Sequence, residues 1–341
     1  MSELKFLKRL LKAIHLAPKA PAADIASAPP AAPAIEPRAV PPRPGLARRA
    51  EKKRLAGELR KARHPKAAMI LAAAMGGHAS AAGVVQETQV YKTTDRGPLH
   101  IEIYKPAGAV PDGGRACVVF FHGGAWRRGS PRQFRAFSTL LAERGVIGMT
   151  AEYRLLQDND GAIPFDAVQD ARSALRWVRR NAQKLGCDVR RIGAGGGSAG
   201  GHLALMTAMK TDVDDPKDDL AVDPRPAALV LFNAPLNFDD YPSPVPLAQR
   251  RKLAPYYLLD GSLPPTLMMQ GTDDRTVSYE QAVAFRDKAK QVGVKDLTLV
   301  SFQGRKHGFF NKGKGGKGEP GDFDAAAGDM MDFLRRLGWL Q

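Results

Sequence analysis

The chain has 341 residues, which is long enough for one large or two ordinary domains, and its 44% of hydrophobic residues can form a sizeable core. Its net charge of +16 is uneven: residues 1–66 contribute +11, so the remainder carries only +5, which argues against nucleic-acid binding by the body. Two cysteines, Cys117 and Cys187, are expected as free thiols and exclude a disulfide scaffold, and no apolar run is long enough for a transmembrane helix.

Three segments precede the first strand. Residues 1–16 place leucine and isoleucine side chains on one helical face, so they either touch an anionic membrane surface or form a solvated helix. Residues 17–45 are rich in Pro and Ala and predict a disordered linker. Residues 46–83 begin basic and become Ala-rich, and 67–81 resembles a late secretory signal or a hinge. Localisation therefore stays open between the cytoplasm and export.

From residue 84 onward, strands and helices alternate. The predicted strands are Val84–Tyr91, Leu99–Tyr104, Cys117–Phe121, Val146–Tyr153, Arg191–Ala194, Ala227–Asn233, Leu267–Gln270 and Leu297–Phe302. The predicted helices are Phe134–Arg144, Phe165–Leu185, Gly201–Met209, Tyr279–Val292 and Ala325–Leu337. Fully apolar strands alternating with helices indicate a mostly parallel sheet that is covered on both faces. Ligands of such sheets bind beyond the carboxyl ends of the strands, so the residues that follow strands are the informative ones.

A Gly-rich turn follows the strand Arg191–Ala194. Its Gly196-x-Ser198-x-Gly200 fits a nucleophile elbow, in which a strained strand-to-helix turn exposes the serine hydroxyl at a helix N-terminus. The same residues also spell a Gly-x-Gly-x-x-Gly dinucleotide fingerprint. The segment after the helix lacks a strand ending in a single acidic residue, which disfavours nucleotide binding.

A second Gly-rich loop follows the strand Cys117–Phe121 and reads His122-Gly-Gly-Ala-Trp. Acyl transfer requires N–H donors where the carbonyl oxygen becomes negative, and such a loop exposes them. We assign the oxyanion hole to the N–H groups of Gly124, Ala125 and Ala199, with a plain glycine turn as the alternative. His122 is expected to orient this loop.

The general base is predicted to be His307, because it lies in a loop after the strand Leu297–Phe302. The orienting acid should lie between serine and histidine in the chain, where the residue pattern leaves Asp273 and Asp274 open. Asp166 and Asp170 are four residues apart on one predicted helix, so structural ion pairs with nearby arginines are expected for them.

These motifs, together with Glu152-Tyr-Arg-Leu and the His-Gly-Phe-Phe-Asn that begins at His307, resemble the α/β-hydrolase esterases near hormone-sensitive lipase. The bacterial group of acetylxylan and feruloyl esterases is the most similar, over residues 84–341. The resemblance implies an α/β-hydrolase fold with a small cap or none. The group's Gly-Thr-x-Asp-x-x-Val pattern places the acid at Asp274. Ala125 replaces the usual third glycine but still supplies an N–H group.

The sequence therefore predicts a serine ester hydrolase with Ser198, His307 and Asp274 as its triad, without metal or cofactor. From the resemblance, its substrates are short acyl esters, including acetyl or feruloyl esters of carbohydrate. An amidase, an aryl-formamidase or a serine peptidase of the same fold is the first alternative. A binding protein built on an inactive hydrolase fold is the second. The acyl and alcohol parts of the substrate and the oligomeric state stay open.

Overall fold

The computed structural model describes residues 83–157, 164–239, 245–312 and 319–340. The predicted segments 1–16 and 17–45, the signal-like stretch 67–81 and all of 46–83 except Gly83 lie outside the described residues. No helix in the described ranges is both long and apolar enough to cross a membrane. Both cysteines are free and buried, as expected from the sequence.

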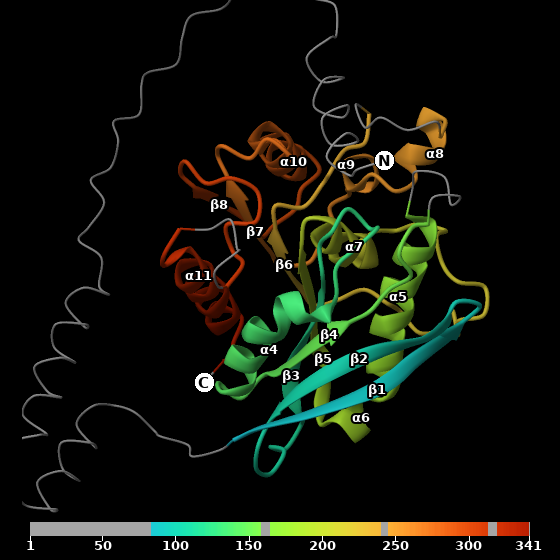
Figure 1. Cartoon of the computed structure of the whole chain (residues 1–341), viewed down its shortest axis with the longest axis vertical. Helices are drawn as coiled ribbons and strands as arrows, with labels where there is room; N and C mark the ends of the chain where they lie inside the picture. The colour runs from blue at the N-terminus through green and yellow to red at the C-terminus, as the bar shows by residue number, and fades with distance from the viewer. Residues whose placement is uncertain (1–82, 158–163, 240–244, 313–318, 341) are drawn as a thin grey trace, which may run out of the picture. The chain divides into compact units, whose positions relative to one another are not determined.

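The core of the molecule is an eight-stranded sheet with the order β1-β2-β4-β3-β5-β6-β7-β8 (Figure 1). In this order, every pair of neighbouring strands from β4 across to β8 is parallel. Strand β2 pairs antiparallel with both of its neighbours, β1 and β4. The strands are β1 (Val84–Thr94), β2 (Gly97–Pro106), β3 (Arg115–Phe121), β4 (Ile147–Ala151), β5 (Cys187–Gly197), β6 (Ala228–Phe232), β7 (Thr266–Gly271) and β8 (Leu297–Phe302). This arrangement confirms the predicted mostly parallel sheet.

Helices cover both faces of the sheet because the buried strands are apolar on both sides. Side chains of α5, α7 and α10 pack in one hydrophobic cluster, and those of α4 and α11 pack in the other. Figure 1 shows α4 and α11 together on one side of the sheet and α5 and α7 on the other. The helical elements are η1 (Pro131–Phe134), α4 (Arg135–Ala142), α5 (Phe165–Arg180), α6 (Ala182–Leu185), α7 (Ala199–Ala208), α8 (Leu247–Arg251), α9 (Pro255–Leu258), α10 (Tyr279–Gln291) and α11 (Asp322–Arg336).

The structure differs from the local predictions in several elements. The predicted helix Phe165–Leu185 is divided at Asn181, whose side-chain amide donates to the carbonyl oxygen of Trp177 at 2.8 Å, one way in which Asn competes with helix geometry. The predicted strand Arg191–Ala194 is the centre of the longer β5, which keeps its glycines extended because two neighbouring strands pair with them. The short helices α8 and α9 were not predicted.

Candidate active site

The carboxyl ends of four parallel strands bring the predicted site residues together. The Gly-rich loop that begins at His122, called the oxyanion loop below after its predicted role, follows β3. Ser198 follows β5, Asp274 follows β7 and His307 follows β8. Strands β3 and β5 are hydrogen-bonded neighbours, and so are β7 and β8. Because all four strands run in the same direction, these loops meet at one edge of the sheet.

The turn at Ser198 has the strained backbone that the elbow motif predicts. Ser198 has φ +54° and ψ −124°, and helix α7 begins at the next residue. A Cβ atom at Gly200 would lie 2.0 Å from the carbonyl oxygen of Phe121, and one at Gly196 would lie 2.4 Å from that of Gly200. Neither contact is sterically allowed. The two glycines therefore permit the close approach of α7 to β3 that holds the serine in place.

The hydroxyl, imidazole and carboxylate form a continuous hydrogen-bonded chain. His307 Nε2 lies 2.8 Å from Ser198 Oγ, and His307 Nδ1 lies 2.8 Å from Asp274 Oδ2. Assigning the ring proton to Nδ1 lets it donate to the carboxylate, and leaves the Nε2 lone pair to accept from the hydroxyl. This is the arrangement required for a histidine to act as a base toward serine.

Local hydrogen bonds fix the carboxylate of Asp274, whose side chain is 0% exposed. Its Oδ1 accepts from the backbone N–H groups of Thr276 and Val277 at 2.8 and 3.0 Å, and its Oδ2 accepts from Gln270 Nε2 at 3.1 Å. Asp273 is exposed, and no contact of its carboxylate with the imidazole is found among the described residues. Asp274 is therefore the aspartate that faces His307.

The loop after β3 has the geometry of a donor site. Gly124, Ala125 and Trp126 have φ values of +123°, +54° and +58°, which keep this loop tightly curled. Gln133 Oε1 accepts from the N–H group of Gly123 at 2.6 Å. Within the described ranges, no hydrogen bond uses the N–H groups of Gly124, Ala125 or Ala199. These three N–H groups therefore have no partner among the described residues, and their role as an oxyanion hole stays a prediction.

Two other histidines are buried near this edge. His122 Nδ1 lies 2.8 Å from the carbonyl oxygen of Gly123, its ring stacks on Tyr153, and burial lowers its pKa. His202 is fully buried in α7, where burial lowers its pKa to about 4 and its Nε2 lies 2.7 Å from the carbonyl oxygen of Leu253. Neither ring contacts Ser198 among the described residues, which fits a loop-orienting role for His122.

The prediction from sequence missed Asn233, which directly follows β6 and is buried. Its Nδ2 lies 2.7 Å from Nδ1 and 3.1 Å from Nε2 of His307. One atom that close to both ring nitrogens lies against the face of the imidazole. The signal was present, because Asn233 is a polar residue at the carboxyl end of an apolar strand. It was interpreted only as the last residue of that strand.

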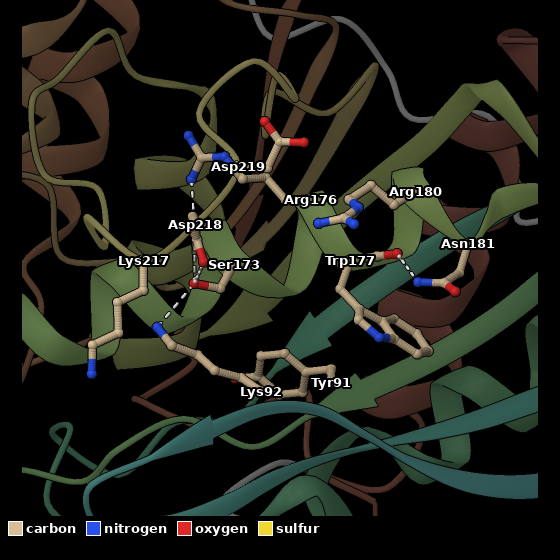
Figure 2. Close-up of a pocket in the computed structure, with 10 residues that line it drawn as sticks. All are labelled: Tyr91, Lys92, Ser173, Arg176, Trp177, Arg180, Asn181, Lys217, Asp218 and Asp219. Atoms are coloured by element: carbon tan, nitrogen blue, oxygen red, sulfur yellow. Dashed lines mark hydrogen bonds and ion pairs between the residues drawn. The ribbon is translucent and has the colours of Figure 1, made fainter.

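A second polar cluster lies between β1 and α5, and its Lys92 also lines a hollow of about 400 Å³ (Figure 2). Asp170 is bound by Arg154 at 2.8 Å and by Lys92 at 2.7 Å, and Asp166 contacts Arg154 at 3.3 Å. These contacts confirm the structural ion pairs expected for Asp166 and Asp170. Of the predicted site residues, none lines this hollow. No group of three His, Cys, Asp or Glu side chains suited to a metal ion is found in the described part of the chain.

Comparisons with known proteins agree with this geometry. A family model described as BD-FAE matches residues 101–241. Esterase 2 of Thermogutta terrifontis is 38% identical, with a TM-score of 0.68, over 75% of this chain and 95% of that one. The chain belongs to the α/β-hydrolase esterases.

Several curated relatives of the chain are also named as ester hydrolases. The probable carboxylic ester hydrolase LipM of Mycobacterium tuberculosis is 29% identical over 58% of this chain and 50% of its own length. The arylesterase of Saccharolobus solfataricus is 39% identical over 33% of this chain and 35% of its own length. The esterase spans about half, or less, of the length of the first curated relatives that it matches.

Proposed function

We propose that this esterase hydrolyses carboxylic esters with Ser198 as nucleophile, His307 as general base and acid, and Asp274 as the orienting carboxylate. One observation carries the proposal: the imidazole of His307 lies 2.8 Å from both the serine hydroxyl and the buried aspartate. A hydroxyl is a weak nucleophile at neutral pH, and an adjacent oriented base is the usual way to activate it.

In the first half-reaction, Ser198 Oγ attacks the ester carbonyl carbon while His307 Nε2 takes the hydroxyl proton. The carbonyl oxygen becomes negative and accepts from the N–H groups of Gly124, Ala125 and Ala199. The tetrahedral intermediate then expels the alcohol, which receives its proton from His307, and an acyl-serine remains. Asp274 keeps the ring in the required tautomer and stabilises the imidazolium that forms transiently.

In the second half-reaction, His307 takes a proton from water, and the resulting nucleophile attacks the acyl-serine. The oxyanion again lies among the same three donors. When the intermediate collapses, the proton returns through His307 to Ser198 Oγ and the carboxylic acid leaves. Both halves use the same residues, so no further group is needed for turnover.

We propose short acyl esters of carbohydrate, acetyl or feruloyl, as the substrates. The acyl part is supported by solved forms of the Thermogutta esterase bound to propionate and to butyrate. The carbohydrate part rests on the resemblance to acetylxylan and feruloyl esterases and on the match to the BD-FAE model.

The test combines active-site labelling with a substrate series. A fluorophosphonate probe should label the wild type but not Ser198→Ala, which should also lose at least about 10⁴-fold in kcat. The control Ser262→Ala changes an exposed serine and should behave as the wild type. p-Nitrophenyl esters from acetate to octanoate are compared with a formanilide and a dipeptide amide. Faster amide cleavage would make it an amidase, and an unlabelled, inactive wild type would indicate a binding protein.

A further inference from the structure

A hollow of about 770 Å³ lies beside the oxyanion loop, on the side of that loop formed by η1 and the start of α4. Gly123 and Gly124 line it, and a Cβ atom at Gly123 would lie only 3.2 Å from the Cβ of Ser198. Ser198 and His307 themselves do not line the hollow. Gly123 therefore borders the hollow and also lies directly beside the nucleophile.

The charged residues that line the hollow are all basic: Arg128, Arg132, Arg135 and Lys312. Arg135 is neutralised by Glu102, whose carboxylate it contacts at 2.8 Å and whose pKa it lowers. For Arg128, Arg132 and Lys312, the described residues provide no carboxylate partner. Lys312 Nζ instead lies 5.2 Å from the centre of the Phe323 ring.

The hollow between β1 and α5 differs in this respect. Asp218 and Asp219 line it together with its basic side chains, and Arg176 contacts Asp218 at 3.1 Å (Figure 2). Positive charge that has no acidic counterpart is thus concentrated beside the oxyanion loop. Charges of one sign that line a concave surface attract ligands of the opposite sign.

The walls of the basic hollow are held in place. Gln133 accepts from Gly123 N–H through Oε1 and donates through Nε2 to Asn311 Oδ1 at 2.9 Å, so it joins the oxyanion loop to the segment after His307. A Cβ atom at Gly124 would lie 3.2 Å from Arg128 Cγ, so the stem of this arginine lies along the loop. Arginine is well suited to this position, because its planar guanidinium binds carboxylates through two parallel hydrogen bonds.

We propose that this basic hollow binds a carboxylate carried by the ester substrate, so that the esterase prefers anionic esters such as acylated uronic-acid-containing carbohydrates. This inference rests on the proposed function, because it assigns a substrate class to the same site. Arg128 and Arg132 bind the carboxylate, and the ester carbonyl lies at Ser198 with its oxygen toward Gly124.

The test uses two matched substrate pairs, each corrected for its rate with hydroxide. In each pair, one substrate has a free carboxylate and the other has the same carboxylate as a methyl ester. In mono-p-nitrophenyl glutarate this carboxylate is on the acyl part, and in 3-acetoxybenzoate it is on the alcohol part. For at least one pair, kcat/KM at low salt should favour the anion by about 10-fold, and 0.5 M NaCl should reduce the preference. The pair that responds identifies which part of the ester occupies the hollow.

The double variant Arg128→Gln/Arg132→Gln should lower this anion-to-neutral ratio about 10-fold. Arg128→Gln and Arg180→Gln each remove one positive charge; Arg128→Gln alone should lower the ratio, whereas Arg180→Gln, at the end of α5 and away from the carboxyl edge of the sheet, should leave it unchanged. Hydrolysis of the neutral esters without anion preference, or an equal effect of Arg180→Gln, would overturn the inference and leave the proposed function intact.

Calorimetric binding of glutarate to Ser198→Ala separates the two proposals. Binding that the double variant abolishes supports the basic hollow even if the wild type hydrolyses no ester, in which case only the proposed function fails. Glutarate could instead bind equally to Ser198→Ala with and without the two arginine substitutions, or to neither of these proteins. Either result would show that the proposed carboxylate site is wrong, whatever the esterase activity.

Discussion

Two buried aspartates occupy opposite kinds of environment in this esterase. Asp170 in α5 and Asp274 after β7 both have side chains that are 0% exposed. Permanently charged cations surround Asp170, namely Arg154 and Lys92. Asp274 has neutral donors and one imidazole, that of His307. The same residue type therefore serves two purposes, which its partners distinguish.

The two sets of contacts differ in the groups to which they lead. The Asp170 cluster joins β1, the segment after β4 and α5, and Lys92 extends it to Asp215 at 2.7 Å, so its cations and carboxylates pair with one another. The hydrogen bonds of Asp274 continue through the imidazole to the hydroxyl of Ser198, beside backbone N–H groups of Gly124, Ala125 and Ala199 that no described residue uses. Buried polar groups are normally satisfied, so a site with free donors is where a ligand is expected. The Asp170 cluster is therefore structural, and the Asp274 chain points to chemistry.

The largest expected effect is on turnover. Asp274→Asn keeps the size of the side chain but favours the wrong imidazole tautomer, so kcat should fall about 10⁴-fold. The control is the exposed neighbour Asp273→Asn, which should stay within about twofold of wild type. Rates with p-nitrophenyl acetate measure both. A greater loss in Asp273→Asn would reverse the assignment of the acid.

The corresponding change in the other cluster should act on stability. Asp170→Asn removes the carboxylate that Arg154 contacts most closely and leaves Lys92 with Asp215 as its remaining carboxylate partner among the described residues. The free energy of unfolding should fall by up to about 3 kcal/mol, while the rate per folded molecule is retained. Asp166→Asn, in which the altered side chain is 39% exposed, should cost less than about 1 kcal/mol. Urea unfolding measures both changes in stability. A stable but inactive Asp170→Asn would contradict the structural role of Asp170 and its contrast with Asp274.

His202 extends the comparison to a buried ionisable group whose one hydrogen-bond partner among the described residues is the carbonyl oxygen of Leu253, at 2.7 Å. Its pKa of about 4 lies below its usual value of 6.5, so between these values the unfolded chain binds a proton that the folded protein does not. Stability is therefore complete above pH 6.5 and falls by roughly 3 kcal/mol as the pH drops to about 4.

The measurement is urea unfolding at pH 7 and pH 4 for the wild type, His202→Gln and His100→Gln. His202→Gln should lose less stability on acidification than the wild type, whereas His100→Gln, with a side chain that is 40% exposed, should follow the wild type. Equal acid sensitivity in all three proteins would show that His202 does not carry the effect.

Most of the site could be predicted because its parts are local motifs whose meaning depends on chain order. Gly196 and Gly200 are needed for an approach that any side chain would block, so the elbow is apparent in the sequence itself. The choice between Asp273 and Asp274 needed the resemblance, because adjacent residues share their local pattern. In the structure, the carboxylate of Asp274 is the one that lies beside the imidazole of His307.

The elements that were missed depend on tertiary contacts. The glycines of β5 disfavour a strand locally, but pairing with β3 and β6 keeps them extended. The hydrogen bonds of Gln133 with Gly123 and Asn311 join segments that are far apart in the chain. No periodic pattern in the sequence predicts them. Asn233 belongs to this group, since only the meeting of β6 with the loop after β8 brings its amide to the imidazole.

Asn233 allows the smallest and most discriminating prediction. As a positioning residue against the ring of His307, it limits rotation of the imidazole. Its loss should therefore lower kcat roughly 10- to 100-fold with little change in KM, since a small misplacement of a reacting group is enough for such a loss. Asn233 has φ +41°, so Asn233→Ala also strains the backbone, whereas Asn233→Gly removes the amide without that strain.

The two variants separate catalysis from folding. If the amide positions the ring, both should lose the same factor in kcat and in labelling by a fluorophosphonate, while only Asn233→Ala should unfold at a lower urea concentration. If Asn233→Gly keeps full turnover, the amide only fills space beside the imidazole. Asp274 and Ser198 would then suffice to hold the imidazole of His307 in place.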